Sequence, residues 1–187
     1  MNLPAIVALC GPSAAGKSTL IDALLEKHPG TFFRMVGTTT REKRPSERDG
    51  VDYHFVDSER FERLKGEGAF FDSISTPGGE FGSPRPYTSS ETQEKILLYN
   101  LSLSGALELL EHYPSSRLFY LSISRETQRS RLQERHTSLA EIDARTAPFE
   151  AEAELIAAHE GTVVVLNANH PEDIAKNVEK VGELLGL

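Results

Sequence analysis

Four short apolar runs separated by helical patterns predict an α/β fold, with a parallel sheet and helices on both of its faces. The runs cover 5–10, 96–101, 118–123 and 162–166, and continuous apolar strands of this kind are typical of sheets buried on both sides. A polar, turn-rich block at 34–90 interrupts the alternation. With 187 residues in all, we expect one domain with one inserted segment.

The first predicted strand leads directly into Gly11-Pro12-Ser13-Ala14-Ala15-Gly16-Lys17-Ser18, and a helical pattern follows from Thr19 to about His28. The octapeptide fits G-x-x-x-x-G-K-[ST]. Between a strand and a helix, loop N–H groups and the helix dipole converge on a phosphate group. Lys17 adds positive charge at the β- and γ-phosphates, and the Ser18 hydroxyl can ligate Mg²⁺. The alternative, a glycine-containing turn with a solvent-facing lysine, requires the whole motif to match by chance. We therefore expect a nucleoside triphosphate to bind here.

The remaining elements follow from apolar spacing and turn residues. Strand patterns occur at 53–56 and 69–75, with a helix at 58–65 between them that Asp57 is placed to cap. The tetrapeptide Thr76-Pro77-Gly78-Gly79 predicts a turn. Further helices are predicted at 104–112, at 126–135 and, as one long helix, at about 139–159. Pro171 is expected to start the last helix.

Composition narrows the function classes. A net charge of −8 argues against a nucleic acid or an anionic membrane surface as the partner. Arginine is nevertheless clustered at 41, 44 and 48 and again at 125, 129, 131 and 135, which indicates either small anionic ligands or solvated charged faces.

The cysteines, the histidines and the apolar runs indicate where the protein acts and whether its histidines bind a metal. Cys10 is the single cysteine, which excludes an intramolecular disulfide. No run approaches the ~20 apolar residues of a membrane span, and the run 3–10 lacks the basic start of a signal peptide. The six histidines, at 28, 54, 112, 136, 159 and 170, show no metal-ligand spacing. We expect a cytoplasmic protein.

Several blocks after the first helix carry a resemblance to a known enzyme family. The first is Gly37-Thr38-Thr39-Thr40-Arg41-Glu42-Lys43-Arg44-Pro45, followed by Asp49-Gly50-Val51-Asp52-Tyr53-His54-Phe55-Val56. The others are Phe81-Gly82-Ser83, then Arg131 and Arg135 with Arg145 ten residues on, and Asn167 after the last strand. Together with the phosphate loop they span nearly the whole chain, in order, and resemble the guanylate kinase family of P-loop nucleoside monophosphate kinases.

The resemblance implies one guanylate kinase-like domain over 1–187. Its core would be 1–33, 91–125 and 148–187, its monophosphate-binding segment 34–90 and its lid 126–147. It implies ATP and Mg²⁺ as phosphoryl donor and cofactor, GMP or dGMP as acceptor, and a monomer or homodimer. The ATP-binding residues would be Gly11, Ser13, Ala14, Ala15, Gly16, Lys17, Ser18, Thr19 and Asn167, with Ser18 also at the metal. The acceptor-binding residues would be Arg41, Arg44, Tyr53, Asp72, Phe81, Ser83 and Asn100. The catalytic residues would be Lys17, Arg41, Arg131, Arg135 and Arg145.

Elementary chemistry agrees with these implied roles. Two guanidinium forks and a phenol hydroxyl suit a phosphate monoester, and lid arginines neutralise charge on a departing phosphoryl group. No general base is required, because the attacking acceptor oxygen is already anionic. Alignment, charge neutralisation and exclusion of water are then the means of catalysis.

Five positions depart from the family pattern, all on the acceptor side. Asp72 stands where Glu is usual, and its carboxylate falls short by one carbon–carbon bond, roughly 1.5 Å. Phe81 replaces Tyr and Gly37 replaces Ser, so two hydroxyl donors are lost. The acidic pair of the family's apolar-D-I-D-x-Q-G segment becomes Asn100 and Ser102. The alternative for Asp72 is an exposed carboxylate at a strand end with no role in binding. ATP-dependent phosphoryl transfer is thus better supported than the identity of the acceptor.

Two other functions stay open at this stage. A related kinase can have a different acceptor, either another nucleotide or a sugar phosphate such as ribose 1,5-bisphosphate. A guanylate kinase-like binding module with little turnover is the other alternative, although such modules commonly lack a working phosphate loop. Activity with each acceptor distinguishes the three.

Overall fold

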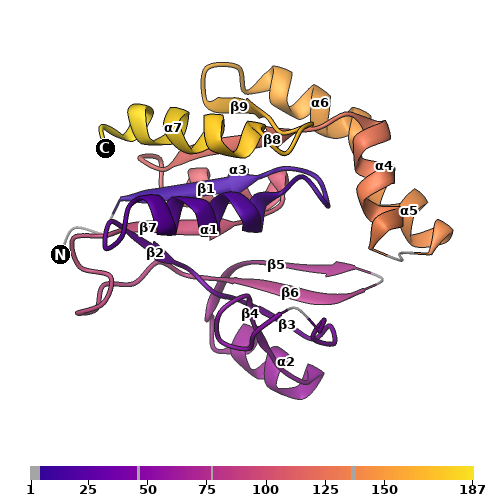
Figure 1. Cartoon of the computed structure of the whole chain (residues 1–187). Coiled ribbons are helices and arrows are strands. Elements are labelled where there is room, and N and C mark those ends of the chain that lie inside the picture. The colour runs from indigo at the N-terminus through magenta and orange to yellow at the C-terminus, as the bar shows by residue number, and fades with distance from the viewer. Residues whose placement is uncertain (1–4, 46, 77, 136–137) are drawn as a thin grey trace.

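A parallel five-stranded sheet lies at the centre of the molecule in the computed structural model, which describes residues 5–45, 47–76, 78–135 and 138–187 (Figure 1). The strand order is β2-β7-β1-β8-β9, and every neighbouring pair is parallel. The bounds are β1 (Ile6–Cys10), β2 (Phe32–Arg34), β7 (Ile96–Asn100), β8 (Arg117–Ser122) and β9 (Val163–Asn167). The predicted parallel α/β sheet is confirmed, and β2 is an additional short edge strand.

Helices cover both faces of this sheet because consecutive residues of β1 point to opposite sides. Val7 and Leu9 pack in one apolar cluster with residues of α1 (Lys17–Lys27) and α7 (Asp173–Leu185). Ala8 and Cys10 pack in the other cluster with residues of α3 (Leu103–His112) and with Ile156 of α6 (Phe149–Ala158). The buried strands are therefore apolar throughout, as their sequence indicates.

A second, four-stranded sheet is formed within the inserted block and lies below the first in Figure 1. Its order is β4-β3-β6-β5, with β3 parallel to β4 and antiparallel to β6, which is antiparallel to β5. The strands are β3 (Gly37–Thr39), β4 (Tyr53–Phe55), β5 (Phe70–Thr76) and β6 (Gly79–Pro84). Helix α2 (Ser58–Gly66) packs on it, and Asp57 caps this helix by accepting the Arg60 N–H at 2.8 Å.

The predicted long helix over 139–159 is wrong: it consists of α5 (Leu139–Thr146) and α6. Pro148 separates them because proline lacks the N–H that a continuous helix needs and its ring clashes with the preceding turn. Helix α4 (Arg125–Glu134) precedes α5, and both project away from the central sheet in Figure 1. The last helix begins at Asp173 rather than Pro171, since Asp173 accepts the His170 N–H at 2.9 Å and closes the turn before it.

Three features of the sequence analysis include residues outside the described ranges. These residues are Pro77 of the predicted turn, His136, and residues 3 and 4 at the start of the run 3–10. In the described part of the chain, no helix is both long and apolar enough to cross a membrane.

Candidate active site

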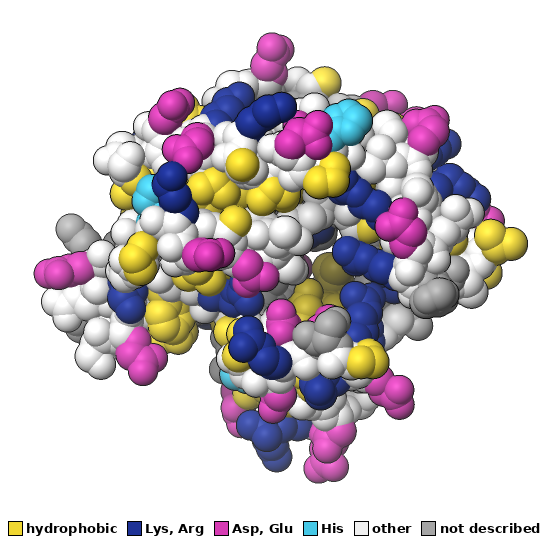
Figure 2. All heavy atoms as spheres, viewed as in Figure 1, with side chains coloured by type: hydrophobic (Ala, Val, Ile, Leu, Met, Phe, Trp, Pro, Cys, Tyr) yellow, Lys and Arg dark blue, Asp and Glu magenta, His cyan; other side chains and the backbone are white. Residues whose placement is uncertain are grey.

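A cavity of about 520 Å³ opens between the phosphate loop, the second sheet and the α4–α5 arm. Figure 2 shows basic side chains gathered around this hollow. Its cationic lining consists of Lys17, Arg41, Arg44, Arg135 and Arg145, and its acidic lining of Glu47, Asp72, Glu141 and Glu152. A chain with an overall charge of −8 thus concentrates cations where an anion can enter.

The loop from Gly11 to Ser18 is held by its backbone. Gly11 has φ of +139°, and a Cβ there would come 2.6 Å from the carbonyl oxygen of Leu121 on the neighbouring strand β8. Ala14 and Gly16 also have positive φ, at 67° and 97°. The Ala15 N–H donates to the Pro12 carbonyl at 3.2 Å and closes the turn. Only glycine fits at position 11, because the loop lies directly against β8.

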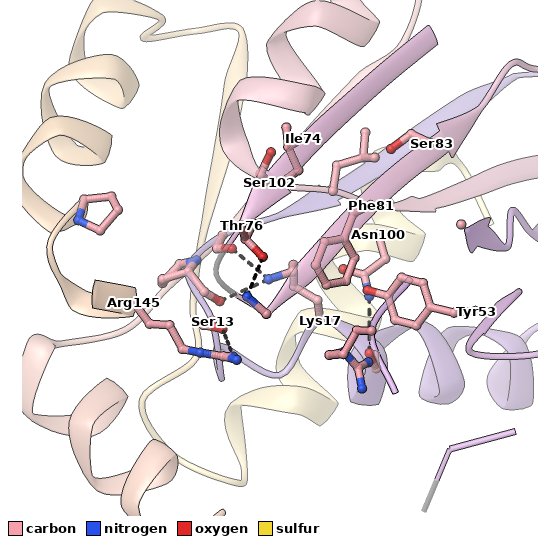
Figure 3. A pocket seen from close by; sticks show the side chains of 18 of the residues that line it. Ser13, Lys17, Tyr53, Ile74, Thr76, Phe81, Ser83, Asn100, Ser102 and Arg145 are labelled. Atoms are coloured by element: carbon pink, nitrogen blue, oxygen red, sulfur yellow. Dashed lines mark hydrogen bonds between the residues drawn. The ribbon is translucent and has the colours of Figure 1, made fainter. Parts of the chain in front are cut away.

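Lys17 points back into this loop. Its Nζ donates to the Gly11 carbonyl at 2.7 Å and to the Pro12 carbonyl at 3.0 Å (Figure 3). Burial lowers the pKa of Lys17 to about 8, and Arg135 acts in the same direction. Burial raises the pKa of the adjacent Cys10 thiol to about 12, so this thiol is a neutral core group and not a nucleophile.

Ser18 and Asn100 meet beside the loop. The Asn100 Nδ2 donates to the Ser18 Oγ at 3.3 Å, which joins the end of β7 to the start of α1. Ser102 does not face this pair through its hydroxyl, which caps α3 at the Gly105 N–H, 3.1 Å away, and contacts the Ser104 Oγ at 3.0 Å. Among the described residues, no three His, Cys, Asp or Glu side chains are grouped as metal ligands.

The arginines of the α4–α5 arm fall into two groups. Arg135 and Arg145 line the cavity, and the Arg145 Nη1 donates to the Ser13 Oγ at 3.2 Å (Figure 3). Arg131 is not among the lining residues. Its guanidinium donates to the carbonyls of Ala14, Ala168 and Asn169 at 3.2, 2.9 and 3.0 Å. It therefore ties the phosphate loop to the chain that follows β9.

Some predicted ATP-binding residues lie outside the cavity lining: Ala14, Ala15, Gly16, Thr19 and Asn167. Thr19 is exposed on α1. Asn167, exposed at the end of β9, accepts the Asn169 Nδ2 at 2.7 Å, while its backbone carbonyl accepts the Asn177 Nδ2 at 2.8 Å. The Asn167 side chain thus shapes the turn beyond β9.

On the opposite wall, Arg41 forms a bidentate ion pair with Glu47, at 3.0 and 2.9 Å. The Arg41 Cζ lies 5.7 Å from the ring centroids of both Tyr53 and Phe55. Burial acts to raise the pKa of Glu47, but hydrogen bonds from Arg41 and the Arg44 N–H outweigh it and hold that pKa below its ordinary value. Sequence reasoning missed Glu47, because several carboxylates lie in the same arginine-rich stretch and spacing does not single this one out.

Tyr53 is enclosed by two of the departures from the family pattern. The Phe81 ring lies edge-on to the Tyr53 ring, with centroids 5.8 Å apart (Figure 3). A Cβ on Gly37 would lie 3.5 Å from the Tyr53 ring and 3.3 Å from the Gly82 carbonyl. Burial raises the pKa of Tyr53, so its hydroxyl remains a hydrogen-bond donor at neutral pH.

Asp72 lies on β5 opposite Ser83 of β6, and both line the cavity. The Asp72 carboxylate lies so close to Gly105 that a Cβ there would collide with its Oδ2. Burial, together with the charge of Glu108, raises the pKa of Asp72. Asp72 is thus a half-buried carboxylate at the first turn of α3, which argues against the fully exposed strand-end alternative.

Two further acidic residues in the lining were not predicted. Glu141 lies 3.6 Å from Arg145, one helical turn away on α5. Glu152 on α6 accepts the Tyr120 hydroxyl at 2.7 Å, with Tyr120 on β8. Both come from the segment that the sequence suggested was one continuous helix, and the break at Pro148 separates the helices that carry them.

Comparison with known proteins shows similarity to one enzyme family. The family model described as guanylate kinase matches residues 4–184. A guanylate kinase of Symbiobacterium thermophilum is 38% identical over 75% of this chain and 67% of its own length. One from Synechocystis is 34% identical over 95% of this chain and 93% of its own. The crystal structure of guanylate kinase from Anaplasma phagocytophilum superposes with a TM-score of 0.69, at 25% identity, over 99% of this chain and 86% of that one.

Proposed function

The chain belongs to the guanylate kinase family, and we propose that it transfers the γ-phosphoryl group of ATP to GMP or dGMP, giving the nucleoside diphosphate and ADP. The observation that carries the proposal is the cavity itself. The phosphate loop, which follows β1 of the central sheet, and the Arg41–Arg44–Tyr53 group of the second sheet line the same space. A donor triphosphate and an acceptor monophosphate therefore have separate anion sites facing one another.

The donor site is formed by the backbone of the phosphate loop. N–H groups at the start of α1 and the positive end of its dipole favour the β- and γ-phosphates. Lys17 is held at the loop by two carbonyls, 2.7 and 3.0 Å from its Nζ, and exchanges these for phosphate oxygens. Its role is to neutralise charge between the β- and γ-phosphates as the bond between them breaks.

Magnesium bound with ATP supplies positive charge to the phosphate oxygens. Ser18 would hold it through its Oγ, which lines the cavity and contacts the Asn100 amide. Magnesium keeps several of its waters and needs only one or two protein oxygens besides the phosphates, so a single hydroxyl with a neutral amide beside it fits such a site.

Acceptor binding rests on side chains. Arg41, Arg44 and Tyr53 surround the monophosphate with N–H and O–H donors, and Asp72 and Ser83 reach toward the base. The Asp72 carboxylate accepts the N1–H and N2–H₂ groups of guanine. Phe81 contributes a ring but no donor, and Asn100 adds an amide between the two sites.

Transfer requires alignment rather than a protein base. An anionic oxygen of the acceptor phosphate attacks the γ-phosphorus while the bond to the β–γ bridging oxygen breaks, and ADP leaves. Arg135 and Arg145 offset the charge that develops, and the contact of Arg145 with Ser13 already joins the α4–α5 arm to the phosphate loop. Closure of this arm excludes water, which would otherwise compete as acceptor.

The single buried thiol and the choice of ATP as donor support a cytoplasmic site of action.

The test is ADP formation from ATP and Mg²⁺ with GMP, dGMP, AMP, CMP, UMP or ribose 1,5-bisphosphate, and with no acceptor as control. We expect turnover with GMP and dGMP well above every other acceptor and above the control. Transfer to the sugar phosphate without transfer to any nucleotide would overturn the proposal. ATP binding without transfer to any acceptor would favour a binding module instead.

A further inference from the structure

The Arg41 guanidinium has five N–H donors, and the structure assigns three of them to protein acceptors. Nη1 donates to the Glu42 carbonyl at 2.7 Å and to the Glu47 Oε2 at 3.0 Å. Nη2 donates one N–H to the Glu47 Oε1 at 2.9 Å. No described residue accepts from Nε or from the second N–H of Nη2.

These two remaining donors lie on one edge of the guanidinium plane. In arginine, the Nε–H and one Nη2–H point the same way, parallel to one another, while Glu47 occupies the end of the fork between Nη1 and Nη2. An edge with two parallel N–H groups matches two oxygens of a phosphate. The Arg41 and Glu47 side chains are only 12% and 14% exposed, and both line the cavity.

Glu47 is itself fixed to the loop that carries it. Its Oε2 accepts the Arg44 N–H at 2.8 Å, and its own N–H donates to the Arg44 carbonyl at 3.0 Å. The rings of Tyr53 and Phe55 restrict Arg41, each with its centroid 5.7 Å from the Arg41 Cζ. A carboxylate anchored in this way cannot leave when an anion arrives without breaking the turn.

We propose that Glu47 is a positioning residue for the acceptor. By occupying the end of the Arg41 fork, it directs the adjacent Nε/Nη2 edge toward the monophosphate. This rests on the proposed function, since it deepens the role of Arg41 in that same site. The competing role for Glu47 is a phosphate surrogate that blocks Arg41 until the acceptor displaces it, and the two roles predict opposite effects of removing the carboxylate.

The experiment compares Glu47→Gln with Glu42→Gln. Both remove one negative charge from the same loop, but Glu42 contacts Arg41 only through its backbone carbonyl, and its side chain is exposed. KM for GMP, KM for ATP and kcat are measured for each, together with the GMP dissociation constant by calorimetry without ATP. We expect Glu47→Gln to raise KM and Kd for GMP about tenfold, the loss of roughly one charge-assisted hydrogen bond, with kcat and KM for ATP within about threefold. Glu42→Gln should leave KM for GMP unchanged or slightly lower, because it removes a charge that repels phosphate.

A fall in KM for GMP in Glu47→Gln, or no change, would overturn the positioning role. Arg41→Ala and the double variant Arg41→Ala/Glu47→Gln complete a double-mutant cycle. This cycle also separates a loss that acts through Arg41 from general damage to the fold by Glu47→Gln. If Glu47 acts through Arg41, the loss caused by Glu47→Gln should largely disappear in the Arg41→Ala background, and an undiminished loss would contradict the proposal. If Arg41→Ala itself leaves GMP binding unchanged, the acceptor site of the proposed function is misplaced, which is a separate failure.

Discussion

The two walls of the cavity are built from different parts of the chain. The phosphate loop is shaped by backbone: positive φ at Gly11 and Gly16, a close approach to β8, and two carbonyls that hold Lys17. The second sheet instead presents side chains that position one another, as Glu47 positions Arg41 and Phe81 abuts Tyr53. A backbone-built site tolerates little change, because Gly11 is required by its space and Gly16 by its positive φ. A side-chain-built site can change one residue at a time while the fold persists, and three of the five departures from the family pattern, Gly37, Asp72 and Phe81, lie on that wall.

Lys17→Ala should produce the largest effect, because it removes the mobile charge at the donor phosphates. We expect kcat to fall by about 10³-fold or more with the melting temperature nearly unchanged. Steady-state kinetics and thermal unfolding check this. An active variant would show that the donor wall is not where the triphosphate is bound.

Arg135→Ala should lower kcat by about 10²-fold, since Arg135 lines the cavity. Arg131→Ala provides the contrast, because Arg131 donates to three backbone carbonyls. We expect its main effect to be a lower melting temperature, by about 5 °C or more. A loss of kcat in Arg131→Ala without any loss of stability would place that arginine on the phosphoryl group instead.

Arg41→Ala should raise KM for GMP by about 10²-fold while KM for ATP changes little, since it removes a bidentate donor from one wall only. Kinetics with each substrate varied in turn separate the two values. Equal changes in both KM values would remove the distinction between the walls.

Asp72→Asn should reduce the preference for GMP over AMP about tenfold, because an amide presents a donor where guanine also has donors. Burial and Glu108 raise the pKa of Asp72, so its ionised form is disfavoured in the fold and stability falls as the pH rises through that pKa. The variant should therefore melt about 1 °C higher at pH 7, and the difference should vanish below about pH 4. Unchanged selectivity would leave Asp72 without a role in base recognition.

Phe81→Tyr should give the smallest effect and a gain: KM for GMP about threefold lower, because a hydroxyl donor is added beside Tyr53. The Tyr53→Phe variant is the matched opposite change, with an expected rise in KM. No effect from either substitution would mean that the phosphate does not reach this pair of rings.

Sequence patterns predicted the central sheet well because its strands are continuous apolar runs, and β1, β7 and β8 begin and end within about one residue of the predicted bounds. The strands β2, β3 and β4 have three residues each, too few for a periodic signal, and only β4 was indicated. The long helix at 139–159 was wrong because apolar periodicity continues across Pro148 while the backbone cannot.

Site chemistry was less predictable than fold. Motif spacing indicated Arg41 and Arg44, but the Glu47 contact depends on a turn that returns the chain to the Arg44 carbonyl. Similarly, Arg131 and Arg135 are one helical turn apart, yet one braces backbone carbonyls and the other lines the cavity. Such differences arise from side-chain direction, which sequence spacing alone does not specify.

The most direct test of the account is the ratio of kcat/KM for GMP to that for IMP in the wild-type protein. IMP lacks only the N2 amino group and keeps N1–H. The ratio therefore isolates the hydrogen bond that Asp72 is proposed to accept from N2, while the donor wall and the monophosphate site are unchanged. We predict that GMP is favoured at least about tenfold. A ratio near one would contradict guanine recognition by the second sheet, even with an intact phosphate loop opposite.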